Sequence, residues 1–118
     1  MALGPGDRRQ LLAAAKARLD LLALYPRPVS LARVHLLVSP AVFRLPWLRR
    51  FDGYAAWQTI LLRRAPRPED ADLVCHELCH VWQMQHRPLK MPLSYLRSGS
   101  AANTSEAEAW AAVEATRR

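Results

Sequence analysis

The sequence predicts an α+β fold in a single domain that spans residues 1–118. Two observations favour this class. Apolar residues recur at helical spacing near both ends and in the centre of the chain, whereas two short apolar, partly β-branched runs precede the central helix. The chain is also long enough for one hydrophobic core and short for two. We therefore expect an N-terminal helix, a small twisted sheet, a central helix and a C-terminal helix.

The first element is predicted to be an amphipathic helix from Arg8 to about Leu24. Asp7 is a suitable N-cap, and the backbone restriction that Pro26 imposes on its neighbour ends the helix. Apolar residues recur three or four positions apart at Leu11, Leu12, Ala15, Leu19 and Leu22. This stripe is expected to pack across the domain.

Two strands are expected before the central helix. Residues 34–39 form an apolar, β-branched run that Pro40 closes, and residues 54–63 follow the Asp52-Gly53 turn signal. The intervening residues 40–51 mix aromatic side chains with arginines and show no clear period. This segment is interpreted as cover for the core, with a flap over a cleft or a stacking surface for nucleic acid as alternatives.

The central stretch, residues 70–85, contains His76-Glu77-Leu78-Cys79-His80, a match to H-E-x-x-H. Residues four apart lie on the same face of a helix, so the imidazoles of His76 and His80 are expected side by side, a spacing that lets both bind one zinc ion. Glu77 lies about 100° around the helix from His76, where its carboxylate could accept a proton from a zinc-bound water. The alternative is a pair of core histidines, each hydrogen-bonded to a neighbour.

The remainder of this helix is apolar on nearly every side, which predicts that the helix is buried. Its polar stripe must then face a cleft or a partner. Both cysteines of the chain, Cys75 and Cys79, lie on it. Helical neighbours rarely form disulfides, so two buried thiols in a reducing compartment are expected.

Two histidines need at least one further protein ligand to hold zinc. The C-terminal helix is expected from Glu106 to Thr116, and on it Glu106 shares one stripe with Trp110 and Val113. A carboxylate on an apolar stripe needs a buried partner, and a metal ion is a good one. Glu106 is therefore the preferred third ligand.

Two other residues are alternatives for the third ligand. Glu108 lies about 200° from Glu106 around the same helix. His86 lies six residues beyond His80, a spacing at which a third histidine can ligate where a glycine turns the backbone out of the helix. Gln83 stands where that glycine would be.

These residues resemble the gluzincin metallopeptidases. The resemblance covers roughly residues 54–113 and depends on the H-E-x-x-H motif, a preceding strand and the pattern Asn103-x-x-Glu106-x-x-Ala109. The size is similar to that of the minigluzincins and of small bacterial zincin-like domains with a glutamine soon after the motif, here Gln83. The resemblance implies a single-lobe zincin-like domain in which an extended peptide adds along the strand of residues 54–63.

The same resemblance implies a role for each residue of the site. His76, His80 and Glu106 would be the zinc ligands and Glu77 the general base. Trp110 stands where larger relatives have an aspartate that orients a ligating histidine. With no obvious downstream histidine to stabilise an oxyanion, Tyr95 is the candidate for that role.

The expected function is therefore that of a zinc-dependent metallopeptidase, which hydrolyses peptide bonds through a zinc-bound water activated by Glu77. The alternative is a catalytically degenerate zincin-like scaffold that binds zinc and a protein partner.

The composition of the chain limits which binding partners are expected. The net charge of +7 comes mostly from arginines in scattered pairs, so nucleic acid is not expected as a partner. No leader and no apolar run of about 18 residues is visible, which favours a soluble, cytoplasmic protein without a membrane partner.

Overall fold

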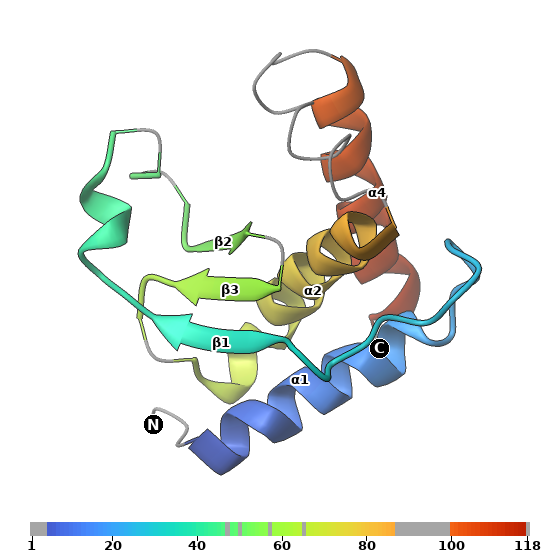
Figure 1. The fold of residues 1–118 in the computed structure, drawn as a ribbon, viewed down its shortest axis with the longest axis horizontal. Coiled ribbons are helices and arrows are strands. Elements are labelled where there is room, and N and C mark those ends of the chain that lie inside the picture. The colour runs from blue at the N-terminus through green and yellow to red at the C-terminus, as the bar shows by residue number, and fades with distance from the viewer. Residues whose placement is uncertain are drawn as a thin grey trace.

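Helices flank one side of a small sheet in this protein, as a computed structural model shows (Figure 1). The structure describes residues 5–46, 48–49, 51–56, 58–64, 66–86 and 100–117. In these residues the helices are α1 (Pro5–Leu19), α2 (Ala71–His86) and α4 (Ser100–Thr116), and the strands are β1 (His35–Val38), β2 (Gly53–Ala56) and β3 (Thr59–Leu62). Two 3-10 turns cover Val42–Arg44 and Pro68–Asp70. The predicted α+β class is confirmed.

The three strands form one mixed sheet in the order β1-β3-β2. β1 runs parallel to β3, with His35 opposite Thr59, and β2 runs antiparallel to β3, with Gly53 opposite Leu62. β2 therefore forms an edge of the sheet, and it packs against α2. The strand expected at residues 34–39 is confirmed as β1.

The prediction of one continuous strand over residues 54–63 is wrong, because the chain reverses after Ala56 and forms the hairpin of β2 and β3. Ten extended residues would span about 33 Å, which is close to the largest dimension of the molecule, 38 Å. By folding back, the segment pairs its own backbone groups and turns Ile60 and Leu62 into the core.

The helix boundaries differ from the predicted ones at three ends. α1 begins at Pro5 rather than at Arg8, so Asp7 lies inside the helix and is not its N-cap. α1 ends at Leu19 rather than near Leu24, since the bonds that follow are turn-like, from the Leu21 and Leu22 amides to carbonyls three residues back. α4 begins at Ser100, six residues before the predicted start at Glu106, although only two residues of this added stretch are alanines. No helix in the described part of the chain is long and apolar enough to cross a membrane.

The segment between β1 and β2 covers part of the core. Phe43 and Leu48 are buried, and the guanidinium of Arg63 lies 5.2 Å from the centre of the Phe43 ring. Phe51 remains partly exposed at the edge of this segment. The side chains described here therefore support the interpretation of residues 40–51 as core cover.

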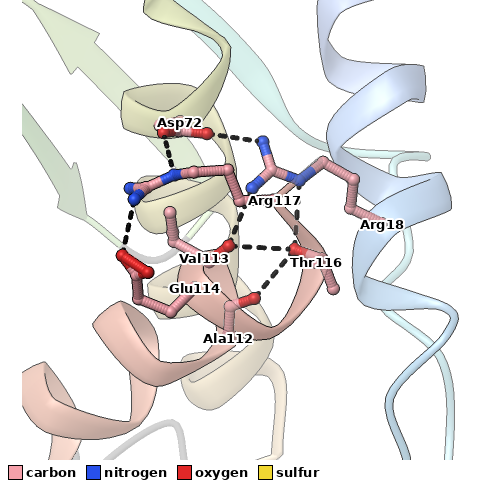
Figure 2. Close-up of polar contacts among 7 residues, drawn as sticks. All are labelled: Arg18, Asp72, Ala112, Val113, Glu114, Thr116 and Arg117. Carbon is pink, nitrogen blue, oxygen red and sulfur yellow. Dashed lines mark hydrogen bonds and ion pairs between the residues drawn. The ribbon is translucent and has the colours of Figure 1, made fainter.

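Arg18 joins all three helices (Figure 2). From α1, its guanidinium donates to Asp72 Oδ1 at the start of α2 (2.9 Å), and to Thr116 Oγ1 and the Val113 carbonyl near the end of α4 (3.0 Å each). Arg117 donates to the other carboxylate oxygen of Asp72 at 2.8 Å. A negative charge suits the first turn of α2 and a positive charge suits the last turn of α4, so these contacts agree with both helix dipoles.

We predict that Arg18→Met lowers the free energy of unfolding by about 2 kcal/mol, because it removes three hydrogen bonds of which one joins two charges. Urea denaturation followed by circular dichroism measures the change. Lys16→Met is the matched control on the same helix. Its exposed ion pair with Asp20 should contribute less than about 0.5 kcal/mol. Equal losses in the two variants would contradict a special role for Arg18.

Asp72 should make part of the stability depend on pH. Burial acts to raise the pKa of Asp72, but hydrogen bonds from Arg18 and Arg117 and the charges of both outweigh it, and the pKa lies below its ordinary 3.8. A carboxyl with a lowered folded-state pKa stabilises the fold above its unfolded pKa, and this contribution is lost as the pH falls through the folded-state value. The stability difference between wild type and Asp72→Asn should therefore be constant near neutral pH and shrink below pH 3.8 in acid titrations.

Candidate metal centre

The two histidines of the motif lie next to each other on one face of α2, as the spacing predicts. Their rings are 4.7 Å apart between centroids, and both side chains are buried. The Nε2 atom of His76 lies 3.0 Å from the Nε2 atom of His80. Both nitrogens thus face the same point beside the helix.

Glu106 reaches this point from α4. Its Oε1 lies 2.9 Å from His80 Nε2, and its Oε2 lies 3.3 Å from His76 Nε2. These three residues form a group whose potential ligand atoms all lie within 4.8 Å of one another. Ligand atoms of a tetrahedral ion with bonds of about 2.1 Å are about 3.4 Å apart. The observed separations are close to that value, and the residues therefore fit a metal ion.

The electrostatics of the group agree with this fit. Burial lowers the pKa of His76 to about 4, helped by the charge of His80, so His76 is neutral at neutral pH and one of its two ring nitrogens carries a lone pair. Burial also acts to lower the pKa of His80, but the hydrogen bond to Glu106 and neighbouring carboxylate charges outweigh it and raise that pKa. A cation between the three groups would replace the proton that His80 otherwise attracts.

Glu77 is buried beside this group and is in contact with the sheet. Burial raises the pKa of Glu77 to about 7, while His80 acts to lower it and the Glu106 carboxylate to raise it. A Cβ atom added to Gly53 would lie 3.3 Å from both Cγ and Oε2 of Glu77. A larger first residue in β2 would therefore require Glu77 to shift by a few tenths of an ångström, and this role of Gly53 is not visible in the sequence, where it only marks a turn.

Neither alternative third ligand belongs to the group. Glu108 accepts hydrogen bonds from the Tyr25 hydroxyl and the Gln83 amide. His86 donates from Nδ1 to the Trp82 carbonyl and stacks on the Tyr25 ring at 4.9 Å. α2 continues through Gln83, and six helical residues rotate His86 by about 240° relative to His80.

Trp110 departs from its predicted position. It was expected on the core stripe with Val113, but its side chain is 47% exposed, while Ala109, Ala112 and Val113 form the buried face of α4. The Trp110 ring instead lies against His76, at 4.1 Å between centroids. His76 Nδ1 is buried and has no hydrogen-bond partner in the part of the chain that the structure describes.

Three further residues that the sequence singled out are the two cysteines of α2 and Tyr95. Cys75 and Cys79 are buried free thiols, as expected, and burial raises the pKa of Cys79 to about 12, so it remains protonated at neutral pH. Tyr95, the candidate oxyanion donor, lies outside the described residues.

No protein-family model, no curated protein and no solved structure matches this chain.

Metal binding tests this geometry directly. We predict that the purified protein binds one divalent ion per chain, and that His80→Ala or Glu106→Gln reduces the affinity at least tenfold by removing a ligand atom. Elemental analysis after dialysis and titration with a fluorescent zinc indicator measure both quantities. His35→Ala is the control and should retain wild-type affinity, because His35 is an exposed residue of β1 that lies outside the group. Loss of the ion in His35→Ala with retention in Glu106→Gln would contradict the assignment.

Proposed function

We propose that this protein is a zinc-dependent metallopeptidase of the gluzincin-like type. The observation that carries the proposal is the convergence of His76 Nε2, His80 Nε2 and the Glu106 carboxylate beside the buried Glu77. Two imidazoles and one carboxylate are a usual protein ligand set for catalytic zinc. A bound Zn²⁺ supplies Lewis acidity, which polarises a carbonyl and lowers the pKa of water to about 7.

Glu77 is the general base in this proposal. Its carboxylate accepts a proton from the attacking water and passes it to the leaving amine. Burial raises the pKa of Glu77 to about 7 in the metal-free protein, and a cation bound beside it would lower this pKa and favour the carboxylate that accepts the proton.

The edge strand β2 is the proposed binding site for an extended peptide. Among the residues that the structure describes, β2 has β3 on one side only, so its other edge carries backbone groups that a peptide strand can pair with. Gly53 is its first residue, and a Cβ atom added there would lie 3.3 Å from Glu77. A peptide paired along β2 would therefore pass the general base. The proposed peptide-binding strand is therefore β2 alone, whereas the sequence indicated the whole of residues 54–63.

One observation favours a second candidate, a zincin-like scaffold that binds zinc and a protein partner without turnover. The side chains of His76, Glu77 and His80 are only 6%, 5% and 4% exposed. Glu106 and Trp110 are far more open, so access to the group is from their side. A peptidase needs room for its substrate to reach the zinc ion, whereas a zinc-binding scaffold does not.

Glu77→Gln separates the two candidates. If the protein is a peptidase, this variant should lose hydrolysis by about 10²–10⁴-fold, because an amide cannot accept the proton, while it retains bound zinc. Cleavage of a mixed peptide library, read by mass spectrometry with and without a zinc chelator, measures the activity. Glu69→Gln, an exposed acid outside the group, is the control and should remain active. A wild type that holds zinc and cleaves nothing would favour the scaffold.

A further inference from the structure

A chain of hydrogen bonds extends from the far side of the His80 ring to the segment after α1. His80 Nδ1 lies 2.8 Å from Gln83 Oε1, and Gln83 Nε2 lies 3.0 Å from Glu108 Oε1. The Tyr25 hydroxyl lies 2.5 Å from the same Glu108 oxygen. These four residues come from α2, α4 and the segment that follows α1. We call them the His80 relay.

The direction of each bond in the His80 relay follows from its acidic end. A carboxylate has only acceptor oxygens, so the Gln83 atom that faces Glu108 must be the amide nitrogen. The Gln83 oxygen then faces His80, and His80 Nδ1 must donate to it. A neutral His80 ring with its proton on Nδ1 presents its lone pair on Nε2, the atom that faces Glu106 and His76.

We infer that Gln83, oriented by Glu108 and Tyr25, is a positioning residue that fixes the tautomer and direction of His80 for metal binding. This inference rests on the proposed metal centre and adds residues that the motif does not specify. Gln83 is fully buried, so water cannot replace its bonds, and a misdirected amide would leave polar atoms unsatisfied. Outer partners of this kind typically change metal affinity by about 10–100-fold.

The contacts of Tyr25 show how the acidic end of the His80 relay is held. The Tyr25 ring packs edge-on against Trp82, at 5.3 Å, and stacks on His86, at 4.9 Å. The hydroxyl is thus directed by two side chains of α2 toward a carboxylate of α4. Tyr25→Phe removes only this outermost bond, so its effect on zinc affinity should be smaller than that of a change at Gln83.

Two measurements on the full chain test the His80 relay. Zinc titration of Gln83→Leu should show affinity reduced by about 10–100-fold. In the metal-free protein, nitrogen-15 NMR should find a proton on His80 Nδ1 in wild type and a lower proton occupancy of that atom in Gln83→Leu, in which Glu106 still accepts from Nε2 but Nδ1 has lost its acceptor. Gln85→Leu is the matched control, since Gln85 lies on the same helix but bonds Ser30 and Gln58. It should leave both readouts unchanged.

A double variant separates the effect of losing the Gln83 hydrogen bonds from the effect of losing packing at this buried position. Gln83→Glu with Glu108→Gln keeps an acceptor facing His80 Nδ1 and restores an amide donor opposite it, so it should recover most of the affinity that Gln83→Leu loses. A folded Gln83→Leu variant with wild-type affinity and tautomer would overturn the inference and leave the metal centre intact. If wild type bound no zinc, the metal centre would fail, and with it the proposed role of Gln83 in metal binding. The tautomer measurement would then decide separately whether Gln83 fixes the His80 ring.

Discussion

The structure depends on the burial of α2. All residues from Val74 to Met84 are buried, and four of them carry polar side chains: His76, Glu77, His80 and Gln83. Water cannot satisfy these groups, so neighbouring elements must do so or the fold loses stability. α4 provides two carboxylates, Glu106 and Glu108, which lie about 200° apart around its axis. One meets the paired imidazoles and the other meets the Gln83 amide, so polar partners as well as apolar packing determine where α4 lies.

The position of α4 is held from both ends. Near its C-terminus the Arg18 contacts attach it to α1 and to the start of α2, and in its first half Glu106 lies against the imidazoles. Between these points the small buried residues Ala109 and Ala112 face the core. The three groups of the candidate centre thus come from packed helices rather than from loops, which keeps them close together before any ion is bound.

Local periodicity explains what could be predicted from the sequence. The paired imidazoles follow from the helical repeat alone, and Glu106 from its place on the wheel of a second helix. The hairpin of β2 and β3 could not be predicted this way, because the chain reverses after Ala56 without a Gly, Asn, Asp or Pro turn signal. The exposure of Trp110 depends on how α4 is rotated when it docks. The His80 relay needs Tyr25 and Glu108 together, residues 83 positions apart whose contact only the tertiary fold creates.

The two imidazoles are held by different forces, and this difference bears on the chemistry. His80 has a hydrogen-bonded acceptor on Nδ1, whereas His76 Nδ1 is buried without a partner among the described residues and is held by packing against the Trp110 ring. A buried donor without an acceptor costs about 1–3 kcal/mol. A cation on His76 Nε2 would require the proton to stay on that same Nδ1. In a metal site, His80 and Glu106 would therefore form the firmer side, and His76 would contribute its lone pair at a cost in stability that the rest of the buried helix would have to offset.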